Sequence, residues 1–325
     1  SIRRHTRYSL QSRGLGDVYK RQLHLRNIVL HDGRPTLFDA IEFDDQLAKI
    51  DVLYDLAFLL MDLWHRALPR HANHCFCTYV SKATTTNDLA GLAVLPLFMS
   101  VRAAVRAMVT IDTLRVSGEQ NNLDSLKELK EYIDLAIALT EPRPPVLIGI
   151  GGLSGTGKTT VSAALAPEIG RPPGALHLRS DVERKRMAGV DPLTPLPDEA
   201  YSQSSSDRVY QHIYDRAEQA LEAGYSVIVD AVFLETERRH RIEQVAAKRK
   251  VPFHGIWLEA AHEKLTQRVF ERRDDASDAD ASVIESQLER QGHVTGWPVI
   301  NTDHAIEDIL SKVRSVIDAR CHAPS

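Results

Sequence analysis

The stretch GGLSGTGKTT, residues 151–160, has glycine, lysine and threonine at a spacing that suits phosphate binding. From residue 152 to 159 it matches the pattern G-x-x-x-x-G-K-[ST] without a mismatch. Glycines in this pattern let backbone N–H groups surround phosphate oxygens, while Lys158 reaches the β- and γ-phosphates and the Thr159 hydroxyl binds Mg²⁺. The residues that we expect to bind the nucleotide are Gly152, Leu153, Ser154, Gly155, Thr156, Gly157, Lys158, Thr159 and Thr160.

Two further positions could act on a phosphoryl acceptor. Asp181 follows the run LHLRS, and Arg184 comes shortly after it. An aspartate at the end of a strand can orient or deprotonate a hydroxyl group, and an arginine can hold the acceptor or a phosphate. We therefore expect both residues to be catalytic. The alternative is that Asp181 caps the helix that follows it.

Asp230 is the third candidate carboxylate. It ends the apolar run SVIVD, where nucleotide-binding α/β proteins keep an acid near Mg²⁺ or substrate. We expect Asp230 and Thr159 to form a magnesium site. The alternative is that Asp230 only accepts hydrogen bonds from neighbouring backbone N–H groups.

The run AAHEKLTQRVFERRDDASDAD, residues 260–280, predicts a helix followed by an acidic loop of small residues. Arg268 and Arg272 share one face of this helix and precede the acidic loop. Such a helix can close over ATP as a lid, and its arginines can neutralise charge on the transferred phosphoryl group. The alternative is a solvated basic face paired with Glu271, Asp274 and Asp275.

These side chains require a scaffold that brings strand ends together. Short β-rich runs alternate with helical patterns after residue 146, and they lie at residues 146–150, 176–180, 226–234, 254–258 and 297–301. This alternation predicts an α/β fold, a parallel sheet with flanking helices. The strand before the glycine-rich stretch and the helix after it favour a phosphate loop over a glycine turn without a ligand.

The first half of the chain has a different pattern. Apolar residues recur at helical spacing in residues 50–68, 92–114 and 123–139. The run TEPRPPV then places three prolines where a helix must stop. We predict a mainly helical unit at 23–141, a linker at 142–145 and the α/β unit at 146–325. Residues 1–22 have no signal-peptide core and include GDVYKRQ, which resembles adapter sequence, so we expect a non-native leader there.

Composition sets limits on partners and compartment. The 325 residues are 43% hydrophobic and 26% charged, with a net charge of −4, which gives no strong signal for nucleic acid. The longest apolar runs fall well short of the roughly 18 residues that a membrane span needs, so no span is expected. Three cysteines are too few for a disulfide framework, which favours the cytoplasm.

The run HANHCFC collects possible zinc ligands. His71, His74, Cys75 and Cys77 lie in a helical context in which half of the side chains diverge. We therefore favour surface histidines and a partly buried cysteine pair over a metal site.

Two family resemblances can be stated on these motifs. Residues 146 to about 303, with GGLSGTGKTT, RSDVERKRM, GYSVIVDAVFL and RVFERRDDASDAD, resemble predicted small-molecule kinases of the P-loop AAA, zeta-toxin and polynucleotide-kinase-like group. Leu23 to about Thr140, with LHLRNIVLHDGRPTLFDAIEF, resembles the C-terminal lobe of an aminoglycoside-phosphotransferase-like domain. Together they resemble an N-terminally truncated bacterial bifunctional phosphotransferase and ATP-binding protein.

The second resemblance implies a vestigial kinase site. Asn27 corresponds to the family's loop asparagine, and Glu42 to its second metal-binding acid. Gln22 stands where the family has its catalytic aspartate, and no glycine-rich loop or nucleotide-binding lysine precedes it. We expect no phosphotransfer from this half.

The sequence therefore predicts a kinase that uses ATP and Mg²⁺ to phosphorylate a small hydroxylated molecule. Two alternatives remain open at this point. One is a regulatory module that binds and slowly hydrolyses ATP without an acceptor. The other is an aminoglycoside-type phosphotransferase activity that belongs to a longer protein. The sequence names neither the acceptor nor the oligomeric state.

Overall fold

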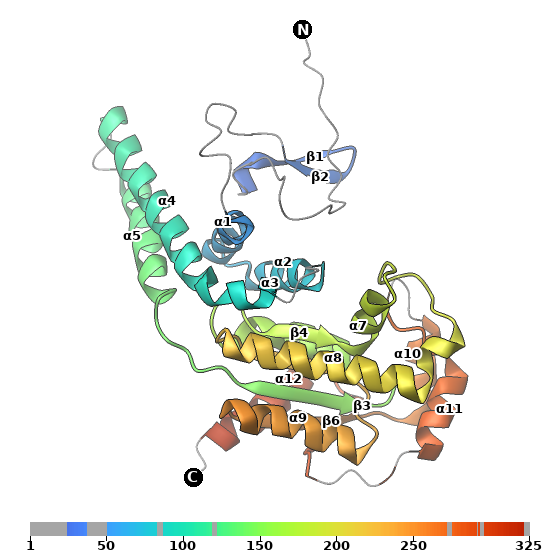
Figure 1. The fold of residues 1–325 in the computed structure, drawn as a ribbon. Helices are drawn as coiled ribbons and strands as arrows, with labels where there is room; N and C mark the ends of the chain where they lie inside the picture. The colour runs from blue at the N-terminus through green and yellow to red at the C-terminus, as the bar shows by residue number, and fades with distance from the viewer. Residues whose placement is uncertain are drawn as a thin grey trace.

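The computed structural model contains a group of helices followed by an α/β unit (Figure 1). It describes residues 25–37, 51–82, 87–118, 122–271, 275–290, 292 and 296–321.

A five-stranded parallel sheet forms the centre of the α/β unit. Its strands are β3 (Leu147–Gly152), β4 (Leu176–Arg179), β5 (Val227–Asp230), β6 (Phe253–Glu259) and β7 (Val299–Asn301), in the order β4-β5-β3-β6-β7. Every neighbouring pair is parallel, so the carboxyl ends of all five strands lie at one edge. The predicted α/β class and parallel sheet are confirmed. Strand β5 is shorter than the predicted run at residues 226–234, because the chain leaves the sheet after Asp230. Phe233, beyond this point, has a positive φ of 51°.

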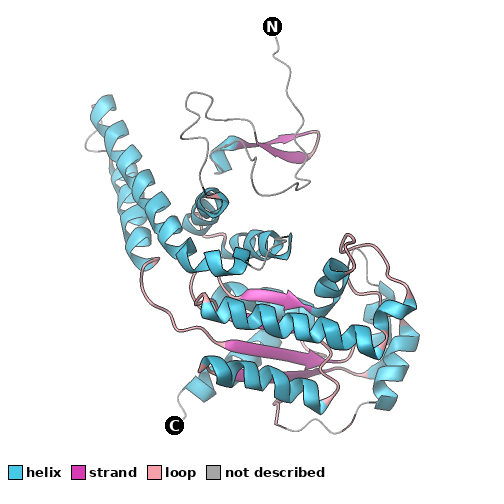
Figure 2. Cartoon of the chain, viewed as in Figure 1, coloured by secondary structure: helices cyan, strands magenta, loops and turns pink. Residues whose placement is uncertain are grey.

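Helices cover both faces of this sheet (Figure 2). Side chains alternate along each strand, so Leu147, Val227 and Val229 belong to one hydrophobic core, while Ile148 and Ile228 belong to another. Helices α8 and α9 contribute to the first core, and α6 and α12 contribute to the second. The elements of this unit are α6 (Lys158–Leu165), η3 (Ala166–Glu168), α7 (Ser180–Met187), η4 (Asp198–Tyr201), α8 (Gln203–Glu222), α9 (Thr236–Arg249), α10 (His262–Glu271), α11 (Ala281–Arg290) and α12 (Ile306–Cys321).

The first part of the described chain is mainly helical, as predicted. Its elements are η1 (Leu25–Asn27), β1 (Ile28–His31), β2 (Arg34–Leu37), α1 (Val52–His65), α2 (Pro69–Lys82), α3 (Asn87–Ala90), η2 (Gly91–Val94), α4 (Leu95–Ser117) and α5 (Leu123–Ala138). Asp51 caps α1, because its carboxylate accepts a hydrogen bond from the Leu53 N–H at 2.8 Å. Residues 141–146 form neither helix nor strand. The resemblance of this part to a kinase lobe, and the boundaries of the predicted units, stay predictions.

The helical part and the sheet share one hydrophobic core. Phe76 and Val80 of α2 are buried in the same cluster as Leu176 of β4 and Tyr225. The rings of Phe76 and Tyr225 lie 5.2 Å apart between centroids. Figure 1 shows α2 beside β4, the strand at one end of the sheet order. The two predicted units are therefore packed against each other through α2.

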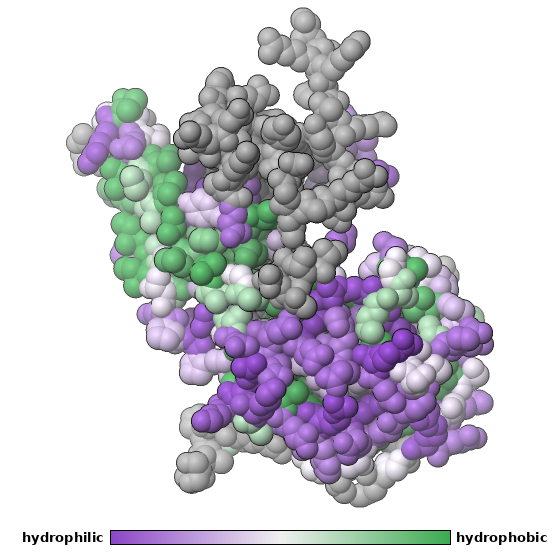
Figure 3. Space-filling view, viewed as in Figure 1, coloured by the Kyte–Doolittle hydropathy of each residue, from purple (hydrophilic) through white to green (hydrophobic). Residues whose placement is uncertain are grey.

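Helices α4 and α5 expose an apolar surface (Figure 3), which includes Leu97, Val101, Met108, Leu126 and Ile137. Among the described residues, Gly91–Ser117 is a helix of 27 residues that could cross a membrane by length and composition alone. The expectation that no span is present stays a prediction: this helix reaches its length by continuing through Arg102, whose guanidinium pairs with Asp55 at 3.2 Å. Core helices of soluble proteins pass the same test, and 33% of the most apolar window is buried.

An ion cluster fixes α7 on α8. The Glu183 carboxylate lies 3.2 Å from His212 Nε2 and 3.4 Å from Arg216 Nε, and it also pairs with Arg186. Burial alone would raise the pKa of Glu183, but the hydrogen bond from His212 and the charges of both arginines hold it below 4.5. Its charged form is therefore favoured in the folded state, and the contribution to stability is lost as the pH falls through the lowered pKa.

We expect Glu183→Gln to lower the free energy of unfolding by about 3 kcal/mol at pH 7, because Arg216 would lose a buried partner. The difference from the wild-type protein should shrink as the pH falls below 4.5. Urea unfolding of the wild-type protein and of Glu183→Gln, from pH 7 to below pH 4.5, measures the difference in the free energy of unfolding. A difference that does not depend on pH would contradict the assigned charge of Glu183.

Candidate functional site

The glycine-rich loop between β3 and α6 has the backbone shape of a phosphate-binding loop. Gly152 and Gly155 have φ angles of 141° and 86°. A Cβ atom at residue 152 would lie 2.5 Å from the Leu258 carbonyl oxygen, and one at residue 155 would lie 2.7 Å from that of Leu265. Only glycine fits at these two positions, because the loop passes directly against β6 and α10.

Helix α6 begins at Lys158, directly after this loop. Its N-cap residue, Gly157, has no side chain that could accept hydrogen bonds from the first turn, so the positive end of the helix faces the loop. The Lys158 Nζ atom donates to the Leu153 carbonyl at 2.9 Å and so folds back over the loop. The predicted phosphate contacts of Lys158 and of the loop amides remain predictions, and this geometry suits them.

Thr159 and Asp230 meet beside the loop. The Thr159 hydroxyl donates to Asp230 Oδ2 at 2.6 Å, and His177 Nε2 lies 3.4 Å from the same oxygen. Burial would raise the pKa of Asp230, but the hydrogen bond with His177 and the charges of His177, Lys158 and Arg179 hold it below its usual range. The charged form of Asp230 is thus favoured, and the side-chain partners described for it are Thr159 and His177.

A hydroxyl and a carboxylate oxygen are donors that suit Mg²⁺, so the pair Thr159 and Asp230 fits this ion. Within the described residues, no group of three or more His, Cys, Asp or Glu side chains could hold a metal by itself. Magnesium usually retains several waters and takes phosphate oxygens as further ligands. In the HANHCFC run, His71 and His74 are exposed, while Cys75 and Cys77 are partly buried.

Asp181 lies in the first turn of α7, close to this pair. Burial raises its pKa, and so does the negative charge of Asp230. Lys158, Arg179 and a hydrogen bond from Ser277 act in the opposite direction. The N-cap residue of α7 is Arg179, which makes no capping side-chain bond, so Asp181 is not the cap that the alternative required. A carboxylate with a raised pKa is a stronger proton acceptor.

The three predicted arginines have different positions. Arg184 donates to the Ala200 carbonyl at 2.6 Å and to the Ser206 hydroxyl at 3.3 Å, while its charge acts on Asp181. Arg268 donates to the Thr302 carbonyl at 2.7 Å and to the Gly155 carbonyl at 3.4 Å. These contacts place Arg268 beside the phosphate loop, whereas Asp274, one of the acids of the alternative, lies outside the described residues. Arg272 lies outside the described residues.

The vestigial kinase residues lie away from this cluster in sequence. Asn27 ends η1, which is anchored to α1 because the Leu25 N–H donates to the buried Asp62 carboxylate at 3.0 Å. Glu42 and Gln22 lie outside the described residues.

The acidic residues at 275–278 contact β4 and α7, and the sequence did not predict these partners. Asp275 pairs with Arg179 at 2.8 Å, and Asp278 pairs with Lys185 at 2.7 Å, although the Lys185 side chain is almost fully buried. Asp278 also accepts hydrogen bonds from the Tyr201 hydroxyl and from the Leu196 N–H. The acidic run DDASDAD and the basic run RSDVERKRM carry opposite charges, and this complementarity was the available signal.

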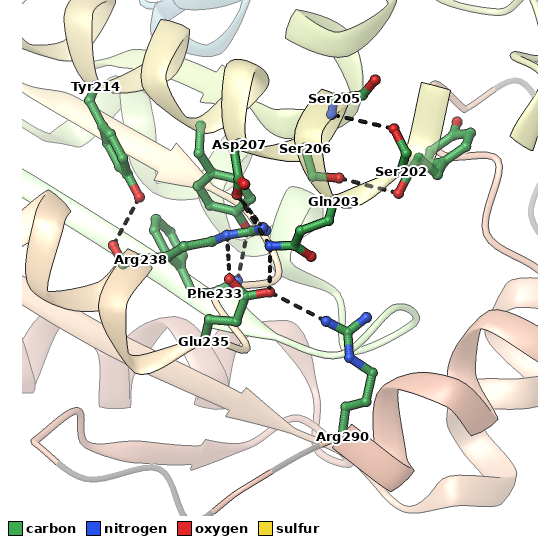
Figure 4. Close-up of polar contacts among 12 residues, drawn as sticks. Ser202, Gln203, Ser205, Ser206, Asp207, Tyr214, Phe233, Glu235, Arg238 and Arg290 are labelled. Carbon is green, nitrogen blue, oxygen red and sulfur yellow. Dashed lines mark hydrogen bonds and ion pairs between the residues drawn. The ribbon is translucent and has the colours of Figure 1, made fainter. Parts of the chain in front are cut away.

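Helix α11 connects the phosphate loop with the segment that follows β5. The sequence did not predict these contacts. The Ser154 N–H in the phosphate loop donates to the Gln287 side chain at 2.9 Å. One turn later, Arg290 pairs with Glu235 at 3.3 Å, as Figure 4 shows. Glu235 also pairs with Arg238, at 2.9 Å, and Arg238 pairs with Asp207 on α8. The phosphate loop, α11 and the segment after β5 are therefore joined by polar contacts.

Comparison with known proteins adds a sequence match. Residues 147–293 match the family model described as an AAA domain. Two curated uncharacterized proteins, from Mycobacterium bovis and Mycobacterium tuberculosis, are each 27% identical over 294 residues, which cover 89% of this chain and 56% of the relative. The chain thus spans about half the length of the curated relatives that it matches.

Solved structures with a similar arrangement were also found. An unliganded sugar kinase from Janibacter sp. HTCC2649 has a TM-score of 0.41 at 20% identity and covers 56% of this chain and 100% of its own. A gluconokinase from Sinorhizobium meliloti 1021 has a TM-score of 0.40 at 18% identity, covering 57% and 100%. The Mycobacterium tuberculosis APS kinase in complex with AMPPNP and APS has a TM-score of 0.39 at 17% identity, covering 55% and 99%.

The matched segment begins in β3 and includes the phosphate loop, Lys158, Asp181, Asp230 and Arg268. Residues 147–293 of this chain therefore match the AAA-domain family over the part that carries the candidate site.

Proposed function

We propose that this chain binds Mg-ATP at the phosphate loop and transfers the γ-phosphoryl group to a small hydroxylated acceptor. One observation carries the proposal. Lys158, the Thr159 and Asp230 pair, and the half-buried Asp181 act on one another at the carboxyl edge of the sheet. Parallel α/β sheets bind ligands at this edge. A phosphate loop next to a carboxylate with a raised pKa supports transfer better than binding alone.

Each side chain then has a defined role. Asp181 would accept the proton of the acceptor hydroxyl as its oxygen bonds to the γ-phosphorus, and the bond from that phosphorus to the bridging oxygen of ADP would break. Lys158 would stabilise negative charge on the phosphate oxygens. Bound Mg²⁺ would neutralise further charge on these oxygens, and Thr159 and Asp230 would hold it.

Helices α10 and α11, with residues 275–278, would form a lid that keeps water from the γ-phosphate together with Arg268. Arg268 joins α10 to the Gly155 carbonyl, and Gln287 joins α11 to Ser154. Both lid helices therefore contact the phosphate loop itself. Such contacts can keep water from the γ-phosphate, so that the acceptor hydroxyl is the favoured nucleophile.

A screen of hydroxylated metabolites tests the proposal. Melting temperatures would be measured with each metabolite in the presence of Mg²⁺ and a non-hydrolysable ATP analogue, because an acceptor should add to the stabilisation by the nucleotide. Mass spectrometry with ATP would then detect a product heavier by one phosphoryl group. Stabilisation by the nucleotide with hydrolysis alone, whatever metabolite is present, would favour the regulatory ATP-binding module.

The resemblance of the helical part to an aminoglycoside-phosphotransferase lobe leads to a separate prediction. We expect Asn27→Ala and Glu42→Ala to leave the ATP turnover of this chain unchanged, because Gln22 cannot act as a general base near neutral pH. Steady-state turnover of the two variants measures it. A large loss in either variant would show that the first half of the chain contributes to the reaction, as expected of an aminoglycoside-type phosphotransferase.

A further inference from the structure

Strand β4 is an edge strand of the sheet, with β5 as its neighbour. It carries His177, which contacts Asp230. The strand is four residues long and leads directly into α7 and Asp181. A short strand at a sheet edge has hydrogen-bonding groups that its sheet leaves unpaired. The position of β4 must therefore be fixed from its outer side.

Helix α2 of the amino-terminal part supplies this support. The Asn73 side chain is buried, and its Nδ2 atom donates to the Pro173 carbonyl at 3.1 Å and to the Ala175 carbonyl at 2.9 Å. One turn further along α2, Cys77 Sγ accepts a hydrogen bond from the His177 N–H at 3.4 Å. Burial raises the pKa of the Cys77 thiol to about 12, so this group stays neutral. Two consecutive turns of α2 thus contact the backbone at and before β4.

The supported residue His177 contacts the candidate magnesium site. Side chains alternate along β4, with Leu176 and Leu178 in the core, while the imidazole of His177 lies 3.4 Å from Asp230 Oδ2. The same carboxylate oxygen accepts the Thr159 hydroxyl at 2.6 Å. A continuous chain of contacts therefore runs from α2 through β4 to the phosphate loop.

We propose that α2 is a positioning element of the nucleotide site, in which Asn73 and Cys77 fix β4 so that His177 holds Asp230 beside Thr159. This inference rests on the proposed Mg-nucleotide site. It assigns a role in that site to the amino-terminal helical part, whose own resemblance to a kinase implies only a vestigial function. Neighbours that orient a ligand commonly control the affinity for its metal.

The test is the Mg²⁺ dependence of ADP binding, measured by calorimetry for the wild-type protein and Asn73→Ala. We expect the Mg²⁺ concentration at half-saturation to rise about three- to tenfold, less than the roughly 10–100-fold typical of residues that contact a metal ligand directly. ADP affinity without Mg²⁺ should stay unchanged, because the phosphate loop is intact. An unchanged Mg²⁺ dependence would overturn the inference.

A matched control separates positioning from general stability. The Ser100 hydroxyl donates to the Ala136 carbonyl at 2.7 Å, also within the helical part but between α4 and α5. Ser100→Ala should lower the melting temperature without changing the Mg²⁺ dependence. An equal Mg²⁺ shift in both variants would overturn the inference. If Asn73→Ala does not fold, Cys77→Ala compared with Cys77→Ser replaces it, since serine can still accept from the His177 N–H.

A double-mutant cycle tests whether Asn73 affects the Mg²⁺ dependence through His177. If α2 acts through His177, then adding Asn73→Ala to His177→Ala should cause little further change in Mg²⁺ dependence. Additive effects would overturn the route through His177. Absence of ADP binding by the wild-type protein, with or without Mg²⁺, would instead refute the proposed function itself.

Discussion

Asp181→Asn is expected to keep its nucleotide affinity and to lose phosphoryl transfer by roughly 10²–10⁴-fold, the range typical of lost acid–base catalysis. Asparagine has nearly the same shape as aspartate but cannot accept the acceptor's proton. Affinity should survive because Asp181 acts on the hydroxyl and not on the phosphates. The nearby negative charge of Asp181 is also removed, which should favour an anionic nucleotide slightly.

Two measurements decide this prediction. Calorimetry gives the affinity for an ATP analogue, and a steady-state assay with an accepted substrate gives the rate. Asp191→Asn is a suitable control, because Asp191 is exposed and its carboxylate accepts from the Leu193 N–H in a turn. Transfer near the wild-type rate by a stable Asp181→Asn protein would remove the base assignment and favour the regulatory module.

Lys158→Ala is expected to weaken Mg-ATP binding by about 2–5 kcal/mol, the cost of removing one member of a close charge pair. Lys158 folds over the phosphate loop through the Leu153 carbonyl and is only partly buried, so alanine leaves no cavity in the core. The melting temperature without nucleotide should therefore change little. Calorimetric titration with Mg-ATP measures the loss.

The exposed Lys312 on α12 provides a control of equal charge, and Lys312→Ala should bind ATP as the wild-type protein does. Unchanged affinity in Lys158→Ala would remove the phosphate-loop assignment and the proposed function with it. Loss of affinity together with a large drop in melting temperature would point to a structural role for Lys158.

The alternation of β-rich runs with helical patterns predicted the parallel sheet, but it could not show which groups Arg268 contacts. Two helical arginines followed by acids suggest local ion pairs, yet Arg268 contacts the carbonyls of Gly155 and Thr302. Of the acids in the charged alternative, Asp275 pairs with Arg179 on β4, while Asp274, like Arg272, lies outside the described residues. Charge patterns in sequence identify possible partners, and only the path of the loop selects among them.

The sequence by itself determined the phosphate loop and the parallel sheet. Both depend on residues close together in the chain, since spaced glycines before a helix start permit the tight loop, and short continuous apolar runs supply apolar side chains to both faces of a strand. Tertiary structure decided the rest of the site. Asn73 meets Ala175, His177 meets Asp230, and Lys185 meets Asp278 across long stretches of chain. Such contacts follow from which strand lies at the sheet edge and which helix covers it, because residues far apart in the chain meet only when the whole fold has formed.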